Sequence, residues 1–218
     1  MYKKLAKTIL CILYPSRCAL CDSFINSTEN VCAACYSECH FFSGNFAPVS
    51  LKKVWFRQAR SCVAYNGKLI DAIWGFKYQE RFDLLPFFTN LLTAEASKMN
   101  QYDMIIPVPL HKKRLGSRGF NQSILLGNSL SKQMKIPLKR QLLRRTLRGD
   151  VQVGKKAVQR MEQVRSAFAV SKPADVRAKR ILLLDDVIAT GATVNECAKA
   201  LIKAKAQFVD VLTIARPL

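Results

Sequence analysis

Short runs of apolar residues alternate along the chain with segments in which apolar residues recur every three or four positions. The first pattern is typical of strands buried on both faces of a sheet, and the second is typical of helices that pack one face on it. Because the two patterns alternate, the sequence predicts an α/β fold with a parallel sheet flanked by helices. Strands are expected at Ser61–Asn66, Asp103–Leu110 and Ile181–Leu184, and helices at Leu69–Phe76, Leu84–Met99, 122–134 and Val194–Ala206.

The N-terminal segment is apolar but short. Lys3, Lys4 and Lys7 precede the apolar run Ile9–Tyr14, which is too short for a membrane-spanning helix. No small-residue cleavage site follows this run, which argues against a signal peptide and for a cytoplasmic protein without a transmembrane segment. The pattern favours a short amphipathic helix packed on the next element, and it leaves weak attachment to a membrane surface open.

The chain carries a large positive charge that is unevenly spread. Its 218 residues include 35 Lys and Arg against 15 Asp and Glu, which gives a formal net charge of +20. Residues 111–180 hold nineteen of these cations and only three of the acids. Such a surplus indicates a polyanionic partner, either nucleic acid or an anionic membrane, although it also serves general solubility.

Four cysteines near the N-terminus are spaced as metal ligands. Cys18 and Cys21 form one Cys-x-x-Cys pair, and Cys32 and Cys35 form a second pair after ten intervening residues. Two such pairs can direct four thiolates at one point, which is the tetrahedral set that structural zinc prefers. A module of this length is too small for a core of its own, so we expect a small N-terminal zinc ribbon held together by the metal.

The remaining cysteines are less informative. Cys39 and His40 follow closely and could replace one of the four ligands. Cys11, Cys62 and Cys197 stand alone in the sequence, and a lone cysteine is most often a buried core thiol.

The most specific motif begins where the apolar run Ile181–Leu184 ends. Asp185 and Asp186 stand at the carboxyl end of that expected strand. A turn of small residues separates them from the next helix, and its members are Ala189, Thr190, Gly191, Ala192 and Thr193. In open parallel sheets, ligands bind at this edge of the strands.

The residue types in this motif indicate the chemistry of the ligand. Gly191 allows the backbone amides to face inward, Thr190 and Thr193 add hydroxyl donors, and the new helix contributes its positive end, so the turn suits a phosphate. Two adjacent carboxylates repel phosphate but suit the two hydroxyls of a ribose, with a magnesium ion to offset their mutual repulsion. The sequence therefore predicts a 5-phosphoribosyl site.

Residues 181–193 resemble the thirteen-residue phosphoribosyl-pyrophosphate (PRPP) signature of type I phosphoribosyltransferases. By that resemblance, Asp185 and Asp186 hold the ribose hydroxyls, and Ala189–Thr193 holds the 5-phosphate. In that family, the loop after the first core strand meets the pyrophosphate. The basic residues at the corresponding place here are Lys112, Lys113, Arg114 and Arg118, and a solvated basic loop is the alternative for them.

Two further segments carry open interpretations. Residues 142–168 are basic, and we interpret them either as a mobile flap over the phosphoribosyl site or as a segment that follows a DNA backbone. Aromatic residues also gather between the ribbon and the basic segment, where they suit either the core or base stacking, with the core favoured. These residues are Trp74, Phe76, Tyr78, Phe82, Phe87 and Phe88.

The whole pattern resembles the ComF/GntX family of DNA-uptake proteins. The matching pieces are the two Cys-x-x-Cys pairs, Tyr65, Phe76–Tyr78, Pro107–Leu110, Arg118–Gln122, Arg145, Thr146, Gln152, Phe168 and Asp185–Thr193. The polar stretch Ser43–Asn45 and Pro48 mark the expected boundary between an N-terminal helix and zinc ribbon at 1–45 and a phosphoribosyltransferase-like domain at 46–218. The resemblance also implies single-stranded DNA and a helicase-like competence protein as partners on the cytoplasmic side of the membrane.

Two functions remain open at this point. The first is a binding protein that handles single-stranded DNA and keeps the pocket for PRPP or another ribose phosphate. The second is an active phosphoribosyltransferase, which would transfer the sugar to a nucleobase or related acceptor and release pyrophosphate. The sequence names no general base and no base-recognition hood, which favours the first.

Overall fold

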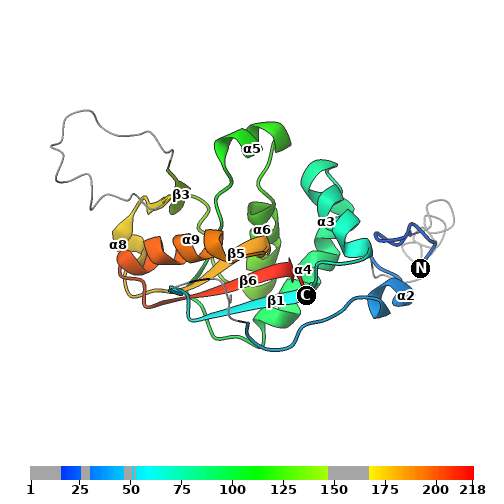
Figure 1. Cartoon of the computed structure of the whole chain (residues 1–218), viewed down its shortest axis with the longest axis horizontal. Coiled ribbons are helices and arrows are strands. Elements are labelled where there is room, and N and C mark those ends of the chain that lie inside the picture. The colour runs from blue at the N-terminus through cyan, green and yellow to red at the C-terminus, as the bar shows by residue number, and fades with distance from the viewer. Residues whose placement is uncertain (1–15, 26–29, 47–50, 52, 147–166) are drawn as a thin grey trace, which may run out of the picture.

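A computed structural model describes residues 16–25, 30–46, 51, 53–146 and 167–218. Its centre is a four-stranded sheet in the order β1-β6-β5-β2, in which every neighbouring pair is parallel (Figure 1). The strands are β1 (Gln58–Ala64), β2 (Met104–Pro107), β5 (Arg180–Val187) and β6 (Phe208–Arg216). The expected parallel α/β sheet is confirmed, and Pro107 stands at the end of an edge strand, where its missing N–H costs nothing.

Helices cover both faces of the sheet (Figure 1). The main-domain helices are α3 (Lys68–Tyr78), α4 (Leu85–Ala96), α5 (Lys112–Arg118), α6 (Gln122–Met134), α8 (Pro173–Val176) and α9 (Ala192–Lys203), with a short turn η1 (Phe82–Leu84) before α4. Side chains on β5 alternate between the two sides, because successive residues of a strand point to opposite faces. Leu182 and Leu184 join the core beneath α4 and α6, whereas Ile181 and Leu183 join the core beneath α9.

Both edges of the sheet are covered by the chain itself. Residues 40–46 run along β1, where the Ala64 amide donates to the His40 carbonyl at 2.8 Å and the Phe42 amide donates to the Cys62 carbonyl at 3.0 Å. On the other edge, the Ile105 amide donates to the Pro137 carbonyl at 2.9 Å. These bonds satisfy backbone groups that an open strand edge would leave unpaired.

A buried carboxylate ties β6 to its neighbours. Asp210 is fully buried, and it accepts hydrogen bonds from the hydroxyl of Tyr102 at 2.7 Å and from the amide side chain of Gln58 at 2.7 Å. Arg57 adds an ion pair at 2.5 Å. A buried charge is tolerated only when it is paired and hydrogen-bonded, and these donors meet that requirement.

The N-terminal ribbon contains the helix α2 (Ala33–Ser37) and packs on α3. Cys18, Ile25 and Cys35 belong to the same apolar cluster as the buried side chains of α3 and α4. Polar contacts join the two parts as well, since the guanidinium of Arg81 donates to the Ala19 carbonyl at 2.9 Å. The division of the chain at 45/46 remains a proposal.

The prediction for the segment after β2 was wrong. Residues 112–118, expected to be a loop, form the exposed helix α5. The segment lacks apolar periodicity and contains Gly116, so its residues carry no helical signal.

Other predictions fall on residues outside the described part of the chain. The expected N-terminal helix lies there, as do Cys11 and most of the expected flap, residues 147–166. The two described ends of the flap pair as an antiparallel hairpin of β3 (Leu143–Arg145) and β4 (Phe168–Val170). Among the described residues, no helix is both long and apolar enough to cross a membrane.

Candidate functional site

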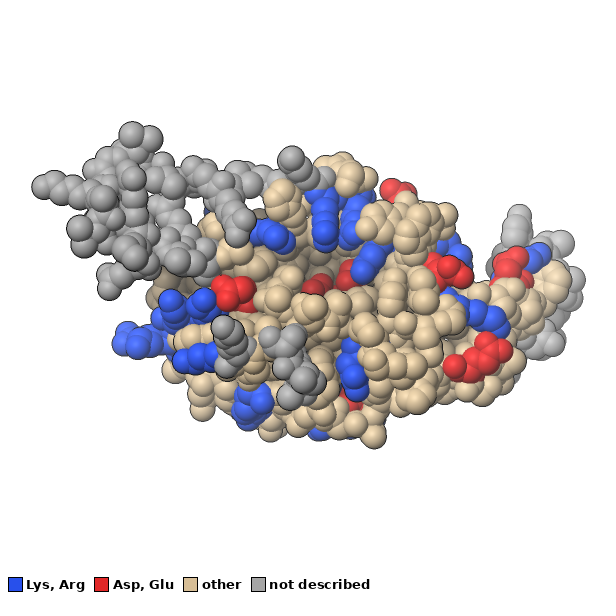
Figure 2. Space-filling model, in the orientation of Figure 1, with Lys and Arg blue, Asp and Glu red and all other residues tan. Residues whose placement is uncertain are grey.

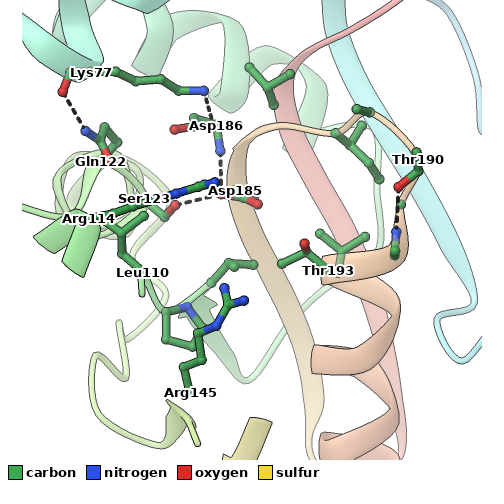
Figure 3. A pocket seen from close by; sticks show the side chains of 18 of the residues that line it. Lys77, Leu110, Arg114, Gln122, Ser123, Arg145, Asp185, Asp186, Thr190 and Thr193 are labelled. Atoms are coloured by element: carbon green, nitrogen blue, oxygen red, sulfur yellow. Dashed lines mark hydrogen bonds and ion pairs between the residues drawn. The ribbon is translucent and has the colours of Figure 1, made fainter. Parts of the chain in front are cut away.

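The acid pair stands at the carboxyl end of β5, as expected for a ligand site in a parallel sheet. Asp185 accepts a hydrogen bond from the Ser123 hydroxyl at 2.9 Å, and Asp186 forms an ion pair with Lys77 at 2.9 Å. Ser123 stands in the first turn of α6, where the side chain of Asn121 caps the helix by accepting from the Ser123 amide. Three elements therefore converge on two adjacent carboxylates (Figure 3).

The Asp186 carboxylate lies close enough to Asp185 to alter the ionisation of Asp185. Burial first, and the neighbouring charge of Asp186 second, raise the pKa of Asp185 from 3.8 to about 7. The hydrogen bonds from the Asp186 amide and from Ser123, together with the Lys77 charge, oppose this shift. The site therefore carries negative charge that is only partly neutralised, which suits hydroxyl donors and a divalent cation.

The turn between β5 and α9 has the geometry of an anion cradle. Gly191 adopts a left-handed backbone (φ 76°) at the N-cap of α9, a conformation that a side chain would strain. The Thr190 hydroxyl accepts weakly from the Ala192 amide at 3.4 Å, and Ala189, Thr190 and Thr193 are exposed. The first amides of a helix have no carbonyl partner within the helix, so the start of the twelve-residue helix α9 attracts negative charge.

The acid pair and the turn Ala189–Thr193 line the same cavity, which has a volume of about 230 Å³. Figure 2 shows Lys and Arg side chains gathered around a hollow that has acidic atoms in its floor. The cations that line the cavity are Lys77, Arg114, Arg118 and Arg145. Lys77 and Arg145 approach the acids from opposite sides (Figure 3), so the site combines an acidic floor with a basic rim.

The structure brings together most of the site residues that the sequence predicts. Asp185, Asp186 and all of Ala189–Thr193 line the cavity, as do Arg114 and Arg118 of the basic segment. The side chains of Lys112 and Lys113 lie outside what the structure describes.

Several residues that line the cavity were not predicted as site residues, among them Ser123, Lys77 and Arg145. Ser123 and Lys77 contact the acids directly, and Arg145 enters from the β3–β4 hairpin. Lys77 belongs to α3, 109 positions before Asp186 in the sequence, so no local pattern connects them. The family resemblance at Lys77 and Arg145 was the one signal that could have identified these two as site residues.

The cysteine cluster fits a tetrahedral zinc site. The Sγ atoms of Cys18, Cys21, Cys32 and Cys35 all lie within 4.8 Å of one another. Zn–S bonds of about 2.3 Å place the sulfurs of a tetrahedron about 3.8 Å apart. The Cys21 and Cys32 sulfurs are 3.8 Å apart, so this pair already has that spacing.

Backbone and side-chain donors surround these sulfurs. The Cys32 amide donates to the Cys18 sulfur at 3.3 Å, and Lys68 of α3 approaches the Cys35 sulfur at 3.5 Å. Hydrogen bonds from Ser23 lower the pKa of Cys21 to about 6, whereas burial raises the pKa of Cys35 to about 12. A thiolate at Cys35 therefore needs the compensating charge of a metal ion.

The other cysteines take no part in this cluster. The buried Cys39 thiol donates to the Cys35 carbonyl at 3.3 Å, and His40 is exposed, so neither replaces a ligand in the described cluster. Cys62 and Cys197 are buried in the two cores, as expected. A zinc ion held by all four sulfurs would have a closed tetrahedral shell, which is the arrangement of structural sites.

Family models match both parts of the chain. A phosphoribosyl transferase domain model matches residues 121–217, and a double zinc ribbon domain model matches residues 9–64. The fold class expected from the sequence, a phosphoribosyltransferase-like sheet with an N-terminal zinc ribbon, is confirmed.

Curated relatives match over most of their length. Competence protein F of Haemophilus influenzae is 31% identical over 207 residues, covering 91% of this chain and 90% of the relative. Competence protein ComFC of Bacillus subtilis is 27% identical over 234 residues, covering 91% of this chain and 94% of the relative. Among solved structures, glutamine PRPP amidotransferase from B. subtilis, complexed with ADP and GMP, aligns with a TM-score of 0.45 and 21% identity over 65% of this chain and 30% of that one.

Proposed function

Since this chain belongs to the competence protein F family, we propose that it serves DNA uptake or utilisation by binding single-stranded DNA and holding a ribose phosphate such as PRPP. The ligand part rests on one observation, which is that Asp185 and Asp186 share a cavity with the Thr-Gly turn. A fold does not establish catalysis, so the proposal stops at binding.

In this proposal, each part of the cavity meets one part of the ligand. The carboxylates of Asp185 and Asp186 accept hydrogen bonds from the two ribose hydroxyls. The amides and hydroxyls of Ala189–Thr193 hold the 5-phosphate at the start of α9. Arg114 and Arg118 at the rim hold the pyrophosphate, because guanidinium groups pair with phosphate oxygens through two hydrogen bonds.

A magnesium ion fits the same site. The raised pKa of Asp185 reflects burial first and the neighbouring charge of Asp186 second, and Lys77 offsets these effects only in part. A divalent cation bound together with the pyrophosphate would supply the missing positive charge beside this carboxylate. We therefore expect PRPP to bind more tightly with magnesium than without it.

The proposed binding of single-stranded DNA rests on charge. Residues 111–146 contain ten Lys and Arg and no acid. Charges of one sign on a single stretch attract a polyanion strongly at low salt, and the released counterions make binding fall steeply as salt rises. The proposal includes a cytoplasmic location and a helicase-like partner, which the resemblance to the family implies.

Calorimetric titration with PRPP and magnesium tests the pocket. The double variant Asp185→Asn, Asp186→Asn removes both acceptor charges, and we expect it to lose binding while it stays folded. Asp71→Asn is the matched control, because it removes a carboxylate from an exposed position of α3 away from the cavity. Unchanged binding in the double variant would remove the pocket from the proposal.

Anisotropy of a labelled DNA strand tests the second activity. We expect tight binding of single-stranded DNA that weakens steeply with salt and that duplex DNA competes for poorly. An absence of binding near physiological salt would leave the positive charge without a role in DNA handling.

A further inference from the structure

Aromatic side chains form two ring pairs near the cavity. Trp74 and Tyr78 are 51% and 53% exposed, and Phe82 in η1 is 43% exposed. The rings of Trp74 and Tyr78 lie 5.6 Å apart on one face of α3, and Phe82 meets Phe120 at 5.1 Å. We call these four residues the aromatic ladder.

Trp74 and Tyr78 lie on the face of α3 that does not enter the core. Leu69, Ile73 and Phe76 of the same helix are buried, and Phe76 packs edge-to-face on Phe88. The interpretation of the aromatic residues as core is therefore confirmed for Phe76, Phe87 and Phe88 and wrong for the three exposed ones. Exposed apolar side chains that lie together often mark a binding surface, whereas single ones are ordinary.

Arg118 connects the ladder to the cavity. Its guanidinium lies over the Tyr78 ring at 4.3 Å and donates to the Tyr78 hydroxyl at 2.5 Å. The same side chain lines the cavity and donates to Gln122, whose amide in turn donates to the Lys77 carbonyl. The aromatic surface thus begins where the basic rim of the cavity ends.

We propose that the aromatic ladder is the surface on which the bases of single-stranded DNA stack. This inference rests on the proposed DNA binding and names its site. Bases of a single strand expose flat π faces that stack on aromatic rings and on arginine, whereas duplex bases are already stacked on each other. The cationic stretch 111–146, which contributes Arg118 and Phe120, supplies charge that attracts the phosphates of the same strand.

Tryptophan fluorescence gives a direct readout of this contact. The chain has two tryptophans, so Trp55→Phe leaves Trp74 as the sole reporter. We titrate this variant with an oligothymidine strand of about 20 nucleotides, and with an abasic strand of the same length that keeps the phosphates. The ladder predicts strong quenching of Trp74 by oligothymidine and little quenching by the abasic strand.

Affinity gives the second readout. Each stacked base is worth roughly 1–3 kcal/mol, so Trp74→Ala should weaken oligothymidine binding about ten-fold and leave binding of the abasic strand unchanged. Phe24→Ala is the matched control, because Phe24 is a 64% exposed ring of the ribbon with Arg17 over it at 4.4 Å. This control should bind both strands as the wild type does.

The outcomes separate the ladder from the wider proposal. If the wild type binds both strands equally, or if Trp74→Ala and Phe24→Ala behave alike, the ladder is overturned and DNA binding through phosphates stands. If the wild type binds neither strand, the proposed DNA binding fails and the ladder fails with it. Quenching of Trp74 by oligothymidine together with a loss specific to Trp74→Ala supports the ladder.

Discussion

Replacing Asp185 with asparagine should stabilise the folded protein, although it removes a group of the proposed ribose-phosphate site. The amide is nearly isosteric with the carboxyl group and carries no charge to bury. In the folded protein, the pKa of Asp185 is raised from 3.8 to about 7 by burial and by Asp186. Ionised Asp185 therefore weakens the fold, as is common where a site is built for binding rather than for stability.

The size of the effect follows from the pKa. Each pKa unit corresponds to about 1.4 kcal/mol, so the full shift sets an upper bound of about 4 kcal/mol. Solvent reaches part of the side chain, and we expect Asp185→Asn to recover about half of the bound, roughly 2 kcal/mol. For a chain of this length, that gain raises the melting temperature by about 4–8 °C.

The sign of the pH dependence is fixed by the direction of the shift. The unfolded chain loses the Asp185 proton near pH 3.8, whereas the folded chain keeps it to about pH 7. The stability that this group contributes is complete below the lower value and is lost as the pH rises through the higher one. The advantage of Asp185→Asn should therefore be larger at about pH 7.5 than at about pH 5.5.

Differential scanning calorimetry at these two pH values measures both quantities. Asp71→Asn is the control for the loss of one negative charge, and we expect it to shift the melting temperature little at either pH. A melting temperature of Asp185→Asn at or below that of the wild type at the higher pH would refute the reasoning. A gain that is equal at both pH values would refute the assigned pKa.

Two further predictions concern the core and the ribbon. Tyr102→Phe removes a hydrogen bond to the buried carboxylate of Asp210, which should lower the free energy of unfolding by about 1.5–2 kcal/mol. Chemical denaturation measures this free energy. An unchanged value would show that the hydrogen bond does not stabilise the fold. Tyr36→Phe, at an exposed position, is the control. Cys21→Ser should reduce zinc from about one ion per chain to nearly none by elemental analysis, whereas Cys62→Ala should retain it. Full zinc in Cys21→Ser, or none in the wild type, would contradict the four-cysteine site.

Features formed by residues that are close together in the sequence could be predicted from it. The strand β5, the acid pair and the turn to α9 follow one another within about a dozen residues, and each signal reinforces the next. The cysteine cluster could be predicted for the same reason, because two Cys-x-x-Cys pairs restrict the geometry before any fold is known. The helix α3 was also expected, from the spacing of its apolar positions.

Features that depend on packing could not be predicted. Lys77 pairs with Asp186 because packing brings α3 to the end of β5. No local sequence pattern predicts that packing. The exposure of Trp74 and Tyr78 was missed because large aromatic residues are usually buried, and helical spacing alone does not say which face meets the core. The helix α5 was missed because it is short, exposed and without apolar periodicity.

The covered edges of the sheet restrict how this protein can associate with others. Residues 40–46 lie along β1, and the Pro137 carbonyl and Lys139 amide bond to Ile105 of β2, so each outer strand of the described sheet already has a partner segment. A second copy, or an extended peptide, cannot add a strand there without first displacing part of the chain. Among the described residues, this leaves the helices, the loops, the ribbon and the two-stranded sheet of β3 and β4 as surfaces for association.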